Sequence, residues 1–283
     1  MTSCARERLG ALVRLFTALA LASVVGCLAS APTPRERATS LAREHREAEA
    51  IHILEQHLAC HGDDVASRRL LIRVLALTGD LGAAGREVDT LARELGPNDP
   101  LAFIELGHVY ELTHQYEKAL EMYDRAAEIA PGDPRGPHEG GMRAAHWGER
   151  EWARPRLEEA AKRGANDVEM WHALGLLRVH DRELDGAEEA YRAGLRADPR
   201  AAECHLGLAT VAVLRADPGR ALAEYDSIVA QKPSFAPAHL GRSWALGRLG
   251  RTLEAMAALA EAERLGADPE AVANQRRGLE AEK

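Results

Sequence analysis

Residues 100–131 read PLAFIELGHVYELTHQYEKALEMYDRAAEIAP, and this stretch decides the fold. It contains a small residue, Ala119, followed one helical turn later by the bulky Tyr123. On a helix, such a pair lets a neighbouring backbone approach closely at the alanine, and the larger side chain fills the groove beside it. Pro131 closes the stretch, because proline lacks a backbone N–H and restricts the residue before it. The stretch therefore predicts a helix that packs on another helix and stops at Pro131.

The same pattern recurs along most of the chain. Seven alanines are spaced by 34 residues, or by 35 in one interval: Ala50, Ala84, Ala119, Ala153, Ala187, Ala221 and Ala255. Four residues after each alanine stands a larger side chain, in the order Leu54, Val88, Tyr123, Leu157, Tyr191, Tyr225 and Leu259. Units of this period cannot bury their apolar faces alone and stack on one another instead.

The unit that begins at Pro100 resembles the tetratricopeptide repeat (TPR). That family's pattern is an aromatic residue, Leu-Gly and Tyr, then Ala, Phe or Tyr, Ala and Pro. The unit carries Phe103, Leu106, Gly107, Tyr110, Ala119, Tyr123, Ala126 and Pro131. The unit from Val168 keeps most of the pattern, whereas His205 and His239 replace the aromatic residue in the last two units, and Pro155 predicts a helix that is kinked or starts late. The resemblance covers residues 65–269 and implies an all-α, right-handed solenoid of six stacked helix-turn-helix repeats.

The two ends of the repeat region depart from the pattern. Residues 38–64 are either a degenerate first repeat or one long N-terminal helix. The absence of Gly, Pro, Asn and Asp between Ala38 and Cys60 leaves no turn signal and favours the single helix. Residues 270–283 follow Pro269 and are rich in Arg and Glu. They predict a C-terminal capping helix, because a solenoid needs a polar cap on its last open face.

Residues 1–26 have the organisation of an export signal. Three arginines, Arg6, Arg8 and Arg14, precede the uncharged run from Leu15 to Val25, which is too short to span a bilayer. Gly26 followed by Cys27 resembles a bacterial lipobox, which implies cleavage before Cys27 and acylation of that residue. The alternatives are an ordinary cleaved signal and an uncleaved anchor.

The residues after Cys27 bear on where such a lipoprotein would be held. Leu28 resembles the enterobacterial sorting pattern for the outer membrane, in preference to the inner membrane. Residues 27–37 contain Pro32 and Pro34 and are interpreted as a tether between the lipid and the folded body. Together these features predict a chain held on the periplasmic face of the outer membrane.

Composition and motifs argue against several classes of function. The net charge of −8 disfavours a nucleic-acid-binding protein, which usually carries a basic surplus. The sequence has no Gly-rich phosphate loop followed by Lys-Ser/Thr and no serine in a nucleophile elbow. We therefore predict no enzymatic activity, no catalytic residue, no cofactor and no small-molecule substrate.

One segment suggests a competing function. His57, Cys60 and His61 could bind a metal, although a fourth ligand is missing. The segment also lacks the first cysteine of a covalent haem motif. The alternative is thus a metal- or haem-handling protein on the same helical scaffold.

Cys60 and Cys204 lie about four repeats apart. Because stacked helices are spaced by about 8–10 Å, this separation predicts two unpaired thiols, or pairing between molecules.

The remaining candidate is a binding surface. In the TPR family, the first helix of each repeat lines a concave groove. Carrying over the groove positions gives Arg69, Arg73, Ile104, His108, His138, Met142, His146, His172, Leu176, His180, Leu206, Thr210, Leu240 and Trp244. The Lys and Asn residues that clamp acidic C-terminal tails in some family members are absent. We therefore predict an adaptor that binds envelope proteins or peptide segments, for example in the assembly of a secretin, pilus, motility or cell-wall machine.

Overall fold

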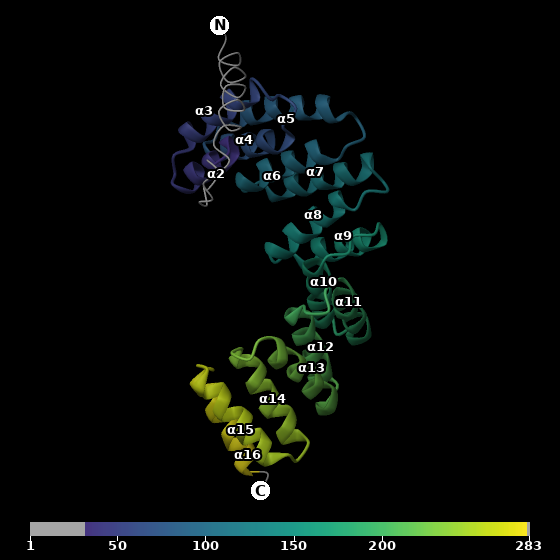
Figure 1. Ribbon diagram of the computed structural model, residues 1–283. Coiled ribbons are helices and arrows are strands. Elements are labelled where there is room, and N and C mark those ends of the chain that lie inside the picture. Colours follow the sequence, from purple (N-terminus) through teal and green to yellow (C-terminus); the bar gives the residue numbers. More distant parts are fainter. Residues whose placement is uncertain (1–31, 282–283) are drawn as a thin grey trace, which may run out of the picture. The chain divides into compact units, whose positions relative to one another are not determined.

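The computed structural model describes residues 32–281, which contain fifteen α-helices and no β-strand. The predicted signal, Cys27 and the first part of the tether lie outside these residues. None of the described helices is both long and apolar enough to cross a membrane. The described residues form two compact units that divide between Gly136 and Pro137, and their helices are labelled in Figure 1. An all-α helical-repeat fold is thereby confirmed for the described residues.

The first unit consists of helix pairs and the start of α8. Its helices are α2 (Pro34–Arg43), α3 (Glu47–Leu58), α4 (Val65–Leu77), α5 (Leu81–Leu95), α6 (Leu101–Leu112), α7 (Tyr116–Ile129) and the beginning of α8 (Arg135–His146). α2 packs on α3, α4 on α5, and α6 on α7. The first helices of successive pairs also touch, because α4 packs on both α2 and α6.

The second unit continues the same arrangement. Its helices are the rest of α8, α9 (Arg150–Lys162), α10 (Val168–His180), α11 (Leu184–Ala197), α12 (Ala202–Leu214), α13 (Pro218–Gln231), α14 (Ala236–Arg248), α15 (Thr252–Arg264) and α16 (Pro269–Ala281). α10 packs on α11 and α12, and α14 packs on α13 and α15. The last helix, α16, covers α14 and α15. α9 runs through Pro155 from Arg150, so the late start considered for this helix does not occur.

A left-handed residue ends the first helix of every pair. The turns between paired helices are three residues long, and their middle residues all have a positive φ: His45, Gly79, His114, Gly148, Arg182, Ala216 and Gly250. In the turn after α12, for example, the amide of Asp217 donates to the carbonyl of Ala212 at 2.9 Å. This bond closes the end of the helix and reverses the chain.

The N-terminal segment differs from the sequence-based expectation in two ways. Residues 38–64 do not form one long helix, because α2 and α3 are separate helices that pack on each other around His45. The preference for a single helix was wrong because His45 adopts the left-handed conformation without being a glycine. Residues 34–37, which were assigned to the predicted tether, belong instead to α2, which begins at Pro34 behind a capping box formed by Thr33 and Glu36.

The periodic alanines lie where helices come closest. The six assigned to repeat packing are fully buried: Ala84, Ala119, Ala153, Ala187, Ala221 and Ala255. The bulky residues a turn later are buried as well, and four of them, Tyr123, Leu157, Tyr191 and Tyr225, pack on glycines of first helices. A Cβ atom at Gly107 would lie 2.6 Å from the ring of Tyr123, and Tyr191 is packed in the same way between Gly175 and Gly207. Because such contacts leave no room for a methyl group, these glycines set the spacing of the helices.

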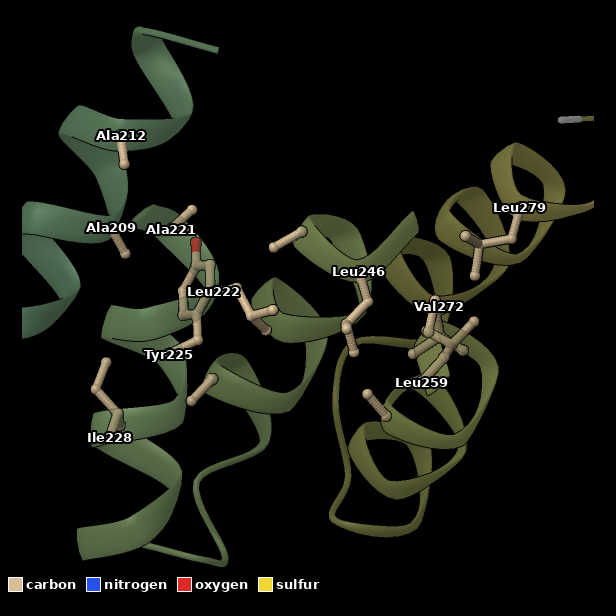
Figure 2. Packing of buried hydrophobic residues seen from close by; sticks show 14 of the residues in the cluster. Ala209, Ala212, Ala221, Leu222, Tyr225, Ile228, Leu246, Leu259, Val272 and Leu279 are labelled. Atoms are coloured by element: carbon tan, nitrogen blue, oxygen red, sulfur yellow. The ribbon is translucent and has the colours of Figure 1, made fainter. Parts of the chain in front are cut away.

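The core of the second unit is continuous across its last helices. Tyr225 and Ile228 of α13 share one cluster of buried side chains with Leu246 of α14. Figure 2 shows how Leu259 of α15 and Val272 of α16 gather beside Leu246. This packing fixes α12 and α14, whose other faces carry several candidate groove residues.

Candidate partner-binding site

The predicted groove residues all lie on the first helices of the pairs. They come from α4 and α6 in the first unit and from α8, α10, α12 and α14 in the second. Within the first unit, α4 packs on α6, and within the second unit, α10 packs on α12. Each unit therefore carries its own part of the candidate surface, and each part has a different chemistry.

In the first unit, two arginines of α4 converge on one carboxylate of α6. Nε of Arg69 donates to Oε1 of Glu105 at 2.5 Å. Nε and Nη2 of Arg73 donate to the two carboxylate oxygens at 2.9 and 3.0 Å. The Glu105 side chain is 0% exposed, whereas those of Arg69 and Arg73 are 37% and 41% exposed. A buried carboxylate thus holds two half-exposed guanidinium groups in place.

The Glu105 carboxylate is strongly stabilised in its charged form. Burial by itself raises its pKa, but hydrogen bonds and charges from its partners, including Arg73 and His108, outweigh burial and lower the pKa to about 2. Nη2 of Arg73 lies 3.0 Å from Nδ1 of His108 and donates to it. Nδ1 of His108 lies 3.6 Å from the Glu105 carboxylate, whereas the arginine nitrogens lie 2.5–3.0 Å from it. The arginines are therefore its closer hydrogen-bond donors.

Two predicted groove residues in the first unit are not available to a partner. Ile104 is 2% exposed and His108 is 6% exposed. The assignment of these two residues to an open groove was therefore wrong. The reason is that α6 packs closely against α4 and α7, which cover this part of its surface.

In the second unit, four predicted residues line one pocket of about 290 Å³. Met142 and His146 come from α8, and His172 and Leu176 come from α10. Ala145, Ala173 and Leu177 complete an apolar lining, while Arg150 and Glu169 lie at its edge. Leu176 is 51% exposed, and together with the apolar lining around it this leaves contiguous apolar surface open to a partner.

His172 contributes an ionisable imidazole ring to this lining. Its ring packs beside that of Tyr191 on α11, with the ring centres 6.1 Å apart. Burial lowers the pKa of His172 below the usual 6.5, although Glu203 and Glu169 act in the opposite direction. Near neutral pH the imidazole is therefore uncharged, and the pocket presents a mostly apolar lining.

The other predicted histidines of the second unit have separate environments. Nε2 of His138 lies 2.9 Å from Asp167, the residue that caps the N-terminus of α10. His180 is exposed and pairs with Asp181. It lines a different, polar pocket of about 520 Å³ that also contains Arg154. His138 and His180 are therefore not part of the pocket that His146 and His172 line.

Three apolar residues continue the surface toward the C-terminus. Leu206 of α12 and Leu240 and Trp244 of α14 are half-buried and pack on the core cluster of the second unit. Thr210 is exposed, and its hydroxyl donates to the carbonyl of Leu206 within the same helix. Part of each apolar side chain thus supports the core, and the remainder is open to solvent.

The segment considered for metal binding has other contacts. Nε2 of His57 lies 2.9 Å from Asp64, and the ring of His57 stacks on that of His61. Burial raises the pKa of Asp64, but hydrogen bonds from Ser67 and His57 lower it to about 2. Over residues 32–281, no three His, Cys, Asp or Glu side chains are grouped as ligands for a metal ion.

The two described cysteines differ from each other. Cys204 is free and buried, and burial raises the pKa of its thiol to about 11. Cys60 is disulfide-bonded, so the prediction of an unpaired thiol at Cys60 was wrong. Cys60 and Cys204 are not joined to each other, as their separation of about four repeats predicted.

Two residues at the pocket edge were missed from the sequence. Arg150 is the first residue of α9, and Glu169 lies in the first turn of α10. The family pattern assigns groove positions to the middle of first helices, so neither residue was considered. A signal was nevertheless present, since Glu169 stands three residues before His172 and shares its helix face.

Family comparisons agree with the repeat assignment. Two models described as tetratricopeptide repeat match residues 100–133 and 148–202. No curated protein matches the chain. The first matched segment contains the α6–α7 pair, and the second extends from the turn before α9 to the start of α12.

Solved structures with a similar fold include several repeat proteins. YrrB, described as a TPR protein with an unusual peptide-binding site, is 17% identical, with a TM-score of 0.59 over 66% of this chain and 97% of that chain. The C-terminal part of a TPR repeat-containing protein from Cytophaga hutchinsonii is 16% identical, with a TM-score of 0.61 over 83% and 97% of the two chains. MamA is 18% identical, with a TM-score of 0.53 over 56% and 93%.

These likenesses concern the fold alone, because the identities are low. The family matches add sequence support at two separate places in the chain. The fold belongs to a class that generally serves as a scaffold for protein interactions. The repeats, the helix pairs and the family matches together identify the chain as a tetratricopeptide repeat protein.

Proposed function

We propose that this protein is a lipid-anchored adaptor that binds envelope proteins through the first-helix face of its second unit. The adaptor would gather its partners at the periplasmic face of the outer membrane during assembly of a secretin, pilus, motility or cell-wall machine. Tethering raises the effective concentration of such partners without any new contact between them. No catalytic step is part of this proposal.

The observation that carries the binding role is the open apolar surface of the second unit. It comprises the pocket around Leu176 and the half-buried side chains of Leu206, Leu240 and Trp244. Exposed apolar surface of this kind marks sites of protein interaction. YrrB, which has the same type of fold, is described as having a peptide-binding site, and this supports a peptide or protein as the ligand.

The proposed location depends on the sequence of the N-terminal residues. The basic start, the apolar run from Leu15 to Val25 and the pair Gly26 and Cys27 support export and acylation. An acyl chain contributes about 0.8 kcal/mol of membrane-binding free energy per buried CH₂ group, and stable attachment to the bilayer takes two or more anchoring groups. The location is tested separately from the binding role.

Membrane fractionation of a Cys27→Ser variant tests the anchor. We expect the full-length wild-type protein to sediment with membranes and the variant to appear in the soluble fraction or as an unprocessed precursor. Cys4→Ser, which changes a cysteine within the predicted signal, is the matched control and should fractionate like wild type. Equal sedimentation of the Cys27→Ser variant and the wild type would refute anchoring through Cys27.

A membrane pull-down with full-length protein tests the binding surface. The variant Trp244→Ala removes an apolar side chain from the first-helix face of α14. The control Leu253→Ala removes one from α15, where Leu253 is 89% exposed. We expect one or more envelope proteins to be lost with Trp244→Ala and retained with Leu253→Ala. Identical partners in both variants would show that binding does not use this face.

A further inference from the structure

The pocket around Leu176 is lined by charged residues of both signs as well as by apolar side chains. Met142 and His172 contribute to the lining, and Leu176 leaves about half of its side chain exposed within it. The volume of about 290 Å³ is at the lower end for small-molecule sites, and it suits one or two side chains of a peptide. We refer to this feature as the Leu176 pocket, lined by Met142, His146, Arg150, Glu169, His172 and Leu176.

One edge of the Leu176 pocket is basic. His146 ends α8 and Arg150 begins α9, and both side chains are exposed. Within residues 32–281, the side chain of Arg150 has no hydrogen-bond or ion-pair partner. Most other arginines described in this unit do have such partners; Arg154, for example, binds Asp181 and Glu183. The guanidinium of Arg150 is therefore available to a carboxylate of a bound peptide.

The edge of the pocket at the start of α10 is acidic. Glu169 lies in the first turn of α10, one turn before His172, and its side chain is exposed. In the described part of the chain, its carboxylate also lacks a hydrogen-bond or ion-pair partner. Because Arg150 of α9 and Glu169 of α10 line the same pocket but do not pair with each other, the pocket offers a partner one positive and one negative group beside its apolar lining.

We infer that the Leu176 pocket binds a peptide segment in which one apolar side chain stands between an acidic and a basic residue. The apolar side chain enters the pocket, the acidic residue faces Arg150 and His146, and the basic residue faces Glu169. This inference rests on the proposed binding role and specifies the chemistry of the partner. The burial of the apolar side chain gives most of the affinity, whereas the exposed charge pairs give selectivity.

Binding of labelled peptides to the full-length protein tests the inference, with fluorescence anisotropy as the readout. Three peptides carry a central leucine flanked by Glu and Lys, by Glu and Glu, or by Lys and Lys. We expect the Glu-Leu-Lys peptide to bind about threefold more tightly than the others, because each exposed charge pair contributes modestly. Replacing the central leucine by serine should weaken binding about tenfold. Equal affinities for the four peptides would overturn the inference.

Variants of the two edges provide a sharper test, because a purely structural role would not reverse a preference. Arg150→Glu makes both edges acidic and should favour the Lys-Leu-Lys peptide. Glu169→Arg makes both edges basic and should favour the Glu-Leu-Glu peptide. If both variants kept the preference of the wild type, these residues would not contact the ligand. The preferences should also decrease as salt is raised, because the pairs are exposed.

Leu176→Asp and its control Leu253→Asp separate this inference from the proposed function. If Leu176→Asp abolishes capture of envelope proteins but the peptides show no charge preference, the adaptor role stands and the inferred ligand chemistry fails. If the peptides bind as expected but no first-helix variant changes capture from membranes, the ligand chemistry stands and the adaptor role fails. If sedimentation shows a second copy of the chain competing with the peptide, self-association replaces the inferred peptide partner.

Discussion

The buried carboxylate of Glu105 allows a quantitative test of the first unit. The change Glu105→Gln keeps the shape of the side chain and removes its charge. The depression of the Glu105 pKa from 4.5 to about 2 corresponds to roughly 3 kcal/mol of stability at neutral pH. Arg69 and Arg73 are half-exposed, so water can replace part of what they lose. We therefore expect the variant to lose about 2–3 kcal/mol.

The expected loss depends on pH in a defined direction. Because the pKa of Glu105 is lowered in the folded state, its contribution is complete above about pH 4.5 and is lost as the pH falls toward 2. The difference between wild type and Glu105→Gln should thus shrink to about half or less at pH 3. Above pH 5 it should stay constant.

Hydrogen exchange read by mass spectrometry measures this effect locally. Peptides from α4 and α6 should lose protection in Glu105→Gln, whereas peptides from α12 to α15 serve as an internal control. Glu121→Gln changes an exposed glutamate of α7 and should have little effect. Unchanged protection of α4 and α6 at pH 7, or a difference that does not vary between pH 3 and 7, would refute the reasoning.

Three further predictions concern the turns, the helix contacts and the pocket. Ala216→Gly should stabilise the protein by about 0.5–1 kcal/mol in urea unfolding. Ala216 has a φ of 54°, and the relief of this backbone strain exceeds the extra entropy that glycine has in the unfolded chain. A loss of stability would contradict this expectation. Gly175→Ala should lower the free energy of unfolding by about 1–3 kcal/mol in the same assay, because the added methyl group meets the buried ring of Tyr191. An unchanged unfolding curve would show that this contact is loose. Binding of a leucine-containing peptide should weaken as the pH falls below 6.5, because His172 has a lowered pKa through burial, despite Glu203 and Glu169, and becomes charged only in that range. Constant affinity from pH 5 to 8 would refute a role for His172 in the pocket.

The turn between α2 and α3 was not predictable from its residue types. No Gly, Pro, Asn or Asp marks the turn at His45, and this absence favoured one long helix. The period contained the missing information, because His45 stands 34 residues before Gly79, which occupies the same place in the next turn. A left-handed histidine is costly, but packing of α2 on α3 offsets that cost.

The candidate site was predictable in part. The helix register placed Met142, His172 and Leu176 on first helices, and the structure brings all three into one pocket. The same register also selected Ile104, which the structure buries almost completely. Periodicity identifies which face of a helix a residue occupies, but it does not give the depth to which neighbouring helices cover that face.

The sequence by itself determined the repeat, its length and the helix contacts, because a small residue recurring every 34 positions is a local pattern that stacking requires. Only the tertiary structure decided which side chains meet across helices. Glu105 collects two arginines from α4, and Arg150 and Glu169 come from different helices to the edges of one pocket. Such groupings depend on the distances between helices, and those distances are set by the packing of all the repeats together.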